Sequence, residues 1–240
     1  EITTPLVFFT LELNRVEDDV LADMLTDPAL ARYKPWLDRL RALKPYQLSD
    51  ELEKFLHDQS VVGAAAWNRL FDETMARLTF EVQGETLPLE ATLTLLSDSD
   101  REKRAAAAAA LSQVFAENLP LFVRVTNTLA KEKEIEDRWR KLPTPQMGRH
   151  LANQVEPEVV QALRDAVVTA FPKLSHRYYA MKAKWLGLDK LQHWDRSAPL
   201  PDEDDRKIGW EEAKATVLDA YSGFSPKMAD IARPFFDKSW

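Results

Sequence analysis

The feature that most constrains this chain is the spacing of its apolar residues, which recur every three to four positions over most of the sequence. Clear cases are Trp67, Leu70, Phe71 and Met75, then Val160, Leu163, Val167 and Phe171, then Ala213, Val217 and Tyr221. This spacing gathers apolar side chains on one face of an α-helix, and prolines such as Pro172 punctuate the helical segments. The first apolar run, residues 6–13, is short enough to be a strand or a helical turn, and we favour a helix. The pattern predicts a mainly α protein, a multi-helix, bundle-like array.

One stretch departs from the helical period. Leu78, Phe80 and Val82 alternate with polar residues, Gly84 interrupts, and a second alternation runs from Leu87 to Leu95. Alternation of this kind indicates strands with one buried face. We therefore predict one β-hairpin over about residues 78–96. A helix should follow through the six-alanine run, residues 105–110, behind a capping box formed by Ser99 and Glu102.

Composition excludes several classes of function. The formal charge is −7 and basic residues form no long run, which argues against a partner made of nucleic acid. The sequence has no cysteine, so disulfides and thiolate metal sites are excluded, and this suits a reducing compartment. No stretch approaches the ~20 apolar residues of a membrane-spanning helix, and residues 1–13 lack a signal-peptide pattern. We expect no membrane partner and a cytoplasmic location.

A search for catalytic motifs finds none. A zinc site of the HExxH type needs two histidines four apart on one helical face, but the four histidines, His57, His150, His176 and His193, are widely separated. Phosphate-binding loops and the GxSxG elbow are also missing from the sequence. The acidic run 202–205 lacks the alternating ligands and glycine of a calcium loop, so we expect a solvated loop there.

The most distinctive stretch is residues 175–200. Its first half predicts a helix that ends at Gly187, since glycine can enter the left-handed conformation that closes a helix and Leu188 could then fold back onto the last turn. A short segment, Leu191 to Arg196, follows as a candidate extended element that ends before Pro199.

Polar and aromatic side chains in this stretch are the candidate site residues. His193, Asp195 and Arg196 form either a polar group on a cleft wall or a set of local hydrogen bonds. Arg177, Tyr178 and Tyr179 suit the binding of a peptide carboxylate or backbone, or the tyrosines are half-buried core. The charged segment Lys131 to Arg140 is most simply a solvated helix face with pairs of opposite charge.

Four segments together resemble a known family. They are LSDELEKFL at 48–56, AAWNRLFDETMARLTFEV at 65–82, SDSDREKRAAAAAAL at 97–111 and HRYYAMKAKWLGLDKLQHWD at 176–195. In order and spacing they resemble the oligoendopeptidase F family of zinc metallopeptidases, relatives of thimet oligopeptidase. The resemblance implies a two-lobed helical fold around a channel that admits short peptides.

The resemblance also implies what this chain lacks. The family's zinc motif and catalytic groups lie C-terminal to the matched part, so we expect no catalytic residue and no metal ligand in this chain. The chain should contain a helical domain with the hairpin, residues 1–120, and the first section of the catalytic domain, residues 121–240, divided near Leu119 to Phe122. Zinc belongs to the full-length parent, where it would polarise the scissile carbonyl and activate water. The expected partners are short peptides and the remainder of its own catalytic domain.

Two other functions stay open. The chain could be a non-catalytic helical scaffold or interaction module, which a reading frame that stops short of HExxH would favour. It could also be a helical enzyme with an unfamiliar site around His193 and Asp195, which replacement of His193 by alanine would test.

Overall fold

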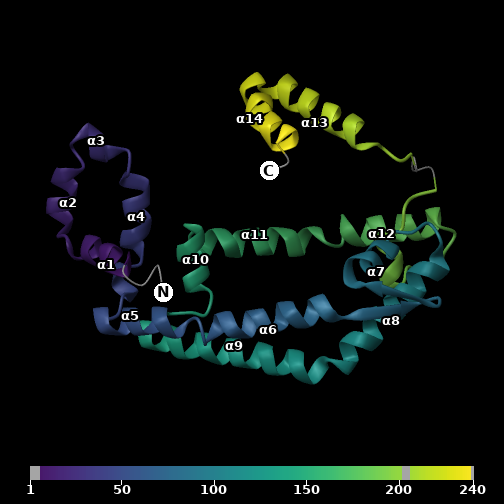
Figure 1. Cartoon of the computed structure of the whole chain (residues 1–240), viewed down its shortest axis with the longest axis horizontal. Helices are drawn as coiled ribbons and strands as arrows, with labels where there is room; N and C mark the ends of the chain where they lie inside the picture. The colour runs from purple at the N-terminus through teal and green to yellow at the C-terminus, as the bar shows by residue number, and fades with distance from the viewer. Residues whose placement is uncertain (1–5, 202–205, 239–240) are drawn as a thin grey trace. The chain divides into compact units, whose positions relative to one another are not determined.

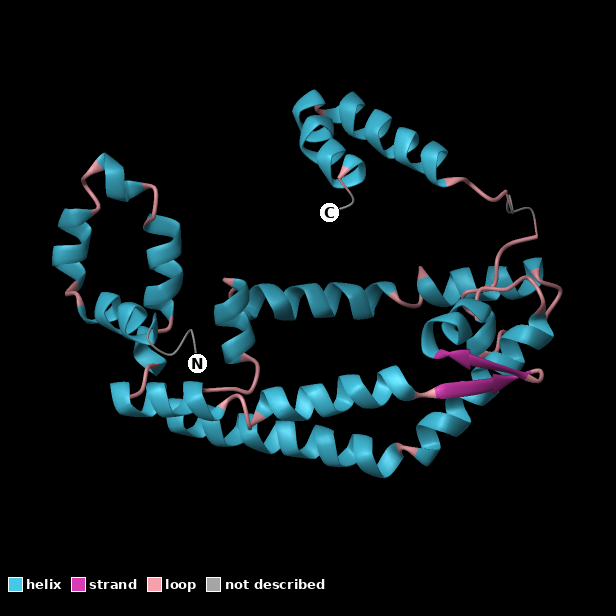
Figure 2. Ribbon diagram, in the orientation of Figure 1, coloured by secondary structure: helices cyan, strands magenta, loops and turns pink. Residues whose placement is uncertain are grey.

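The computed structural model describes residues 6–201 and 206–238. The chain divides into two compact units, Glu1–Pro199 and Leu200–Trp240. Helices dominate both units, and one two-stranded sheet lies in the first (Figure 1; Figure 2). The predicted fold class, a mainly α array with one β-hairpin, is confirmed. The acidic run expected to form a solvated loop, residues 202–205, lies outside the described residues.

Short helices make up the start of the first unit. They are α1 (Val7–Arg15), α2 (Asp18–Met24), α3 (Pro28–Ala31), α4 (Lys34–Ala42), the 3-10 helix η2 (Lys44–Tyr46) and α5 (Asp50–Gln59). The helical prediction for the first apolar run is confirmed by α1. Pro35 lies in the first turn of α4, where its missing N–H costs nothing, and Ser49 occupies the N-cap position of α5. Arg41 donates hydrogen bonds to the carbonyls of Leu13 and Asn14, which ties α4 to the end of α1.

The best-packed region surrounds the hairpin. It contains α6 (Ala64–Arg77), β1 (Thr79–Val82), β2 (Glu85–Pro88), α7 (Leu89–Leu95) and α8 (Arg101–Glu117). The strands pair antiparallel, with Phe80 opposite Leu87, and the turn places both Gln83 and Gly84 at positive φ, as a tight hairpin turn requires. Phe80 is completely buried against Ala107 and Leu111 of α8. The small alanine side chains let the hairpin approach α8 closely.

The predicted extent of the hairpin is wrong at its C-terminal side. The second strand ends at Pro88, and residues 89–95 form α7 instead of continuing the strand. Proline has no N–H to offer the ladder, and Leu89 and Leu93 are also four apart, so the apolar pattern suits a helix equally well. The predicted cap is also shifted by one residue, because Asp100 accepts the N–H of Glu102 at the start of α8.

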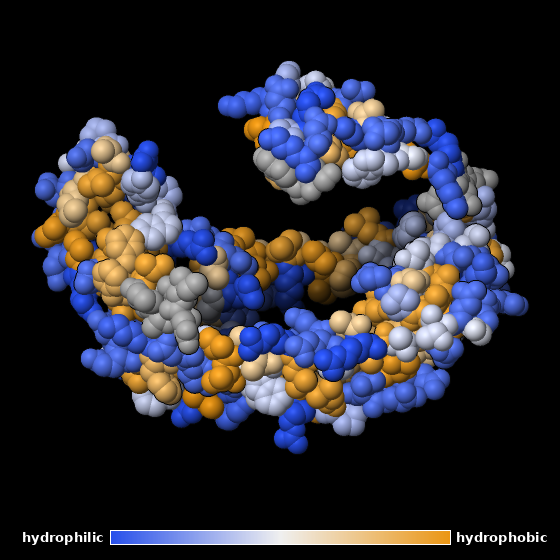
Figure 3. Space-filling view, in the orientation of Figure 1, coloured by the Kyte–Doolittle hydropathy of each residue, from blue (hydrophilic) through white to orange (hydrophobic). Residues whose placement is uncertain are grey.

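The remainder of the first unit consists of α9 (Leu119–Arg140), α10 (Met147–Asn153), α11 (Pro157–Ala170), α12 (Ser175–Trp185) and the 3-10 helix η3 (His193–Asp195). The predicted extended element at Leu191 to Arg196 is corrected, since its centre is η3. The face of α11 that its spacing marks as an inner face is exposed, with Leu163 at 65% and Val167 at 44% of full accessibility. Apolar atoms accordingly lie on the surface along α11 (Figure 3).

The second unit is a helical hairpin of α13 (Trp210–Phe224) and α14 (Pro226–Asp237). Trp210 packs edge-on against Phe236, and Lys214 pairs with Asp237 at 2.8 Å. Over the described residues of the whole chain, no single helix has the length and apolar character needed to cross a membrane. Helices α8 and α9 reach that length and apolar character only when they are counted together, and the chain bends by 65° between them.

Candidate functional site

The helix α12 ends as its sequence predicts. Gly187 has φ of +67°, its N–H bonds the carbonyl of Lys184 at 3.0 Å, and the N–H of Leu188 bonds the carbonyl of Ala183 at 2.8 Å. These two bonds are the Schellman pattern, which uses a glycine in the left-handed conformation to satisfy the last carbonyls of a helix. The turn redirects the chain toward η3.

A buried ion cluster holds η3 against α8. The carboxylate of Asp195 is completely buried and accepts hydrogen bonds from Arg101 (Nε and Nη2, both 3.0 Å) and from Arg104 (Nη2, 3.1 Å). It also accepts the N–H of Gln192 at 2.9 Å, which closes the first turn of η3. On the other side, the buried Lys182 of α12 donates to the carbonyl of Arg196 at 2.8 Å. Side chains from two helices thus fix η3 in place.

Two effects compete on the charge of Asp195. Burial disfavours the carboxylate, but the hydrogen bonds from Arg101, the Gln192 N–H and Arg104 outweigh it and lower the pKa of Asp195 to about 2. The group is therefore ionised at neutral pH. Since its oxygens are occupied by the two arginines and Gln192, Asp195 has a structural role that does not require His193.

The structure brings three of the six candidate residues together. Tyr179, His193 and Arg196 line a pocket of about 460 Å³ between α12 and the segment before η3. Asp195 instead faces α8, and Tyr178 packs against the rings of Tyr179 and Trp185. The sixth, Arg177, is exposed on α12.

Both interpretations of the two tyrosines, peptide binding and half-buried core, stay predictions. Tyr178 is 44% and Tyr179 is 39% exposed. For the polar group of His193, Asp195 and Arg196, the alternative of local hydrogen bonds applies to Asp195, whose position is set by hydrogen bonds.

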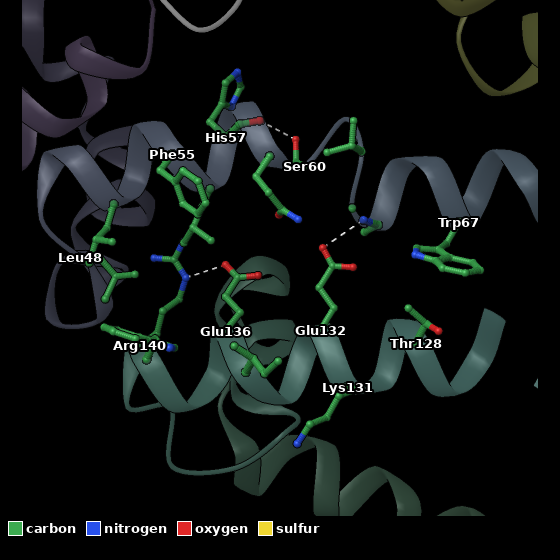
Figure 4. Close-up of a pocket in the computed structure, with 18 of the residues that line it drawn as sticks. Leu48, Phe55, His57, Ser60, Trp67, Thr128, Lys131, Glu132, Glu136 and Arg140 are labelled. Carbon is green, nitrogen blue, oxygen red and sulfur yellow. Dashed lines mark hydrogen bonds and ion pairs between the residues drawn. The ribbon is translucent and has the colours of Figure 1, made fainter. Parts of the chain in front are cut away.

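A larger hollow lies along α9. It measures about 1370 Å³ and is bounded by α5, the start of α6 and one face of α9 (Figure 4). The α9 residues that line it recur every three or four positions: Pro120, Val123, Arg124, Asn127, Thr128, Lys131, Glu132, Ile135, Glu136, Trp139 and Arg140. We call this hollow the α9 groove.

A salt bridge closes one end of the α9 groove. Arg140 donates to both oxygens of Glu53 on α5, at 2.6 and 3.0 Å, and to Glu136 at 2.7 Å. Burial opposes ionisation of Glu53, but the hydrogen bonds from Arg140 and the Leu48 N–H lower its pKa overall, and the same carboxylates raise the pKa of Arg140. The contact joins residues that are far apart in sequence.

A second polar contact joins α9 to the start of α6. Glu132 accepts the N–H of Ala64 at 3.0 Å and so satisfies one of the free amides at that helix end. Gly63 makes room for it, because a Cβ on Gly63 would lie only 2.5 Å from the same Glu132 oxygen. The charged segment of α9 is thus a solvated face only in part: Lys131–Glu134 and Lys133–Asp137 fit that prediction, while Glu132 and Arg140 bind other helices.

Arg101, Arg104 and the α9 groove were not predicted from the sequence. The partners of Asp195 are 94 and 91 residues away, and helical spacing carries no information on such pairs. The only available signal was the regular stripe of residues along α9. Among the described residues there is no group of three or more histidine, cysteine or acidic side chains that could hold a metal ion.

Comparisons with known proteins agree with one another. A family model described as Oligopeptidase F matches residues 12–80. Group B oligopeptidase PepB of Streptococcus agalactiae is 25% identical over 97% of this chain, and oligopeptidase PepF of Bacillus subtilis is 23% identical over 95%. The crystal structure of oligoendopeptidase-F from Enterococcus faecium superposes on 95% of this chain with a TM-score of 0.73 and 23% identity.

This chain matches only part of each of these three known proteins. This chain covers 40% of the PepB sequence, 35% of the PepF sequence and 44% of the E. faecium structure. The chain therefore spans about two-fifths of the length of the relatives that it matches.

Proposed function

We propose that this chain belongs to the oligoendopeptidase F family and is the N-terminal portion of a zinc-dependent oligoendopeptidase that hydrolyses short peptides. Its own part is scaffold and channel wall, and by itself it is inactive. The observation that carries the proposal is the match along nearly the whole chain to only two-fifths of peptidases named for their action on oligopeptides. We place the whole protein in the cytoplasm.

The residues that the structure describes do not suit zinc. The described part of the chain assembles no cluster of suitable side chains, and the sequence contains no HExxH. In the proposal, ligands and catalytic groups belong to polypeptide beyond these residues, and zinc there polarises the scissile carbonyl. We assign no chemical step to the residues of this chain.

The pocket of Tyr179, His193 and Arg196 is the proposed stretch of channel wall. Phenol, imidazole and guanidinium groups can all hydrogen-bond a peptide backbone or carboxylate. The ion cluster of Asp195 and the contact of Lys182 with Arg196 support this role by holding the backbone beneath the pocket. The proposed division between the two domains, near 119–122, falls at the bend between α8 and α9.

Zinc analysis and a quenched-peptide assay test the proposal. The 240-residue chain alone should bind no stoichiometric zinc and cleave no peptide. The chain produced together with the polypeptide encoded directly after residue 240 should do both. Turnover with tightly bound zinc in the chain alone would contradict the proposal.

The exposed apolar face of α11 favours a second candidate, a helical interaction module without peptidase chemistry. The reading frame after residue 240 separates the two. Continuation into HExxH supports the peptidase, whereas a stop codon or a downstream sequence without the motif supports the module.

A further inference from the structure

The α9 groove has no role in the proposed channel wall. At about 1370 Å³ it exceeds the ~300–1,000 Å³ of ordinary small-molecule pockets, so its size suits a longer ligand. One face of α9 forms the floor of the groove, and α5 lies on the other side of the groove. The Arg140–Glu53 and Glu132–Ala64 contacts bridge the helices beside it.

Most charges in the α9 groove have partners. Arg140 binds Glu53 and Glu136, and Lys131 binds Glu134. Two charges differ: among the described residues, neither Arg124 nor Glu132 has an ion-pair partner. Glu132 uses one oxygen for the Ala64 N–H, which leaves the other oxygen available.

These two opposite charges are eight residues apart on the same face of α9. With a rise of 1.5 Å per residue, their backbone positions are separated by about 12 Å. Between them, Asn127 and Thr128 supply polar groups. Trp67 of α6 supplies an aromatic surface on the opposite side (Figure 4).

We infer that the α9 groove binds a short peptide with free ends, its carboxylate at Arg124 and its α-ammonium group at Glu132. An extended chain covers about 3.3–3.6 Å per residue, so the separation corresponds to roughly three or four residues. Asn127 can hydrogen-bond the peptide backbone, and Trp67 contacts an apolar side chain of the peptide. No bond is made or broken in the groove. The inference rests on the proposed function only for the class of ligand.

Binding of blocked peptides to the 240-residue chain tests the site. The probe is a tetrapeptide of alanine and leucine with free ends, compared with its C-amidated and N-acetylated forms, by calorimetry and tryptophan fluorescence. Removal of either terminal charge should weaken binding about fivefold, the upper range for an exposed ion pair. The fluorescence change should disappear in Trp67→Phe.

Matched variants assign each end of the peptide. Arg124→Ala should abolish the effect of amidation, and Glu132→Gln, which keeps an acceptor for Ala64, should abolish the effect of acetylation. Arg138→Ala and Asp137→Asn remove the same charges from α9 outside the groove and should change neither effect, because the partner of Asp137, Lys133, also lies outside it. Equal binding of free and blocked peptides, or no detectable binding, would overturn the inference.

Two outcomes separate this inference from others. A concentration-dependent dimer that Phe55→Ser disrupts would show that the groove receives a second copy and would overturn peptide binding. Hydrolysis by the longer polypeptide without peptide binding by this chain would overturn the groove alone, whereas binding without hydrolysis would overturn only the proposed activity.

Discussion

At the scale of single residues, the decisive group is the carboxylate of Asp195. It is buried, ionised and shared between an arginine that is 3% exposed, Arg104, and one that is 45% exposed, Arg101. Removing one partner of a buried ion pair is costly because the remaining charge stays desolvated. The cluster therefore secures η3, and with it the backbone that carries His193 and Arg196.

The first prediction concerns Asp195→Asn. Loss of the charge should lower the free energy of unfolding at pH 7 by roughly 3 kcal/mol, because two guanidinium groups lose their anion. The folded pKa of about 2 lies below the ordinary 3.8, so this stabilisation is complete above pH 3.8 and disappears as pH falls toward 2. Chemical denaturation at pH 7, 5, 3 and 2 should show the difference between wild type and variant shrinking by about 2 kcal/mol. A constant difference would contradict the assignment.

The second prediction ranks the two arginines. Arg104→Ala should destabilise more than Arg101→Ala, because Arg104 is buried and also donates to the carbonyls of Asp98 and Ser99. We expect a loss on the order of 3 kcal/mol for Arg104 and a clearly smaller loss for the solvent-screened Arg101. Thermal melts of both variants with Lys103→Ala as a control would measure this. Equal losses would show that burial does not govern the cluster.

At the scale of elements, the contact between α9 and α6 gives the third prediction. In Gly63→Ala the new Cβ displaces the Glu132 carboxylate, and in Glu132→Ala the carboxylate is gone, so both variants leave the Ala64 N–H without its partner. Each should cost about 1 kcal/mol, similar to the loss of a helix cap. The double variant should cost clearly less than the sum of the two single losses. A fully additive double variant in urea unfolding would show that the two residues act separately.

Much of the fold could be predicted at this scale, for local reasons. The spacing of apolar residues predicted α6, α11 and α12, and Gly187 marked the end of α12 correctly. The predicted extent of the second strand was wrong because residues 89–95 satisfy both the strand and the helix pattern. Pro88 ends the strand because it has no N–H to donate to the ladder. The predicted extended element at Leu191 to Arg196 was wrong for a related reason. Its 3-10 turn depends on Asp195 accepting the Gln192 N–H while Arg101 and Arg104 hold the carboxylate, which no local pattern contains.

The candidate site was predicted less completely than the fold. Of the six candidate residues in the stretch 175–200, Tyr179, His193 and Arg196 line one pocket, and the function of that pocket stays a prediction. The α9 groove could not be predicted, because it depends on how far α5 stands from α9, and that distance is set by contacts such as Glu53–Arg140 between residues 87 positions apart.

At the scale of the whole molecule, α11 is the helix whose apolar face needs an explanation, because that face is exposed. An amphipathic helix normally buries its apolar face, yet Leu163, Val167 and Phe171 are exposed here. The relatives are more than twice as long as this chain. We expect polypeptide beyond residue 240 to cover this face in the complete protein.

The fourth prediction tests that expectation with Leu163→Lys. Since Leu163 is 65% exposed, the substitution should change the unfolding free energy of the 240-residue chain by no more than about 0.5 kcal/mol. It should nevertheless prevent co-purification with the polypeptide encoded after residue 240, because burying an unpaired ammonium group in an apolar interface costs several kcal/mol. Gln161→Lys places the same charge on the polar side of α11 and should leave co-purification intact. Undiminished association of Leu163→Lys would show that this face stays open to solvent in the whole protein, as the interaction-module hypothesis requires.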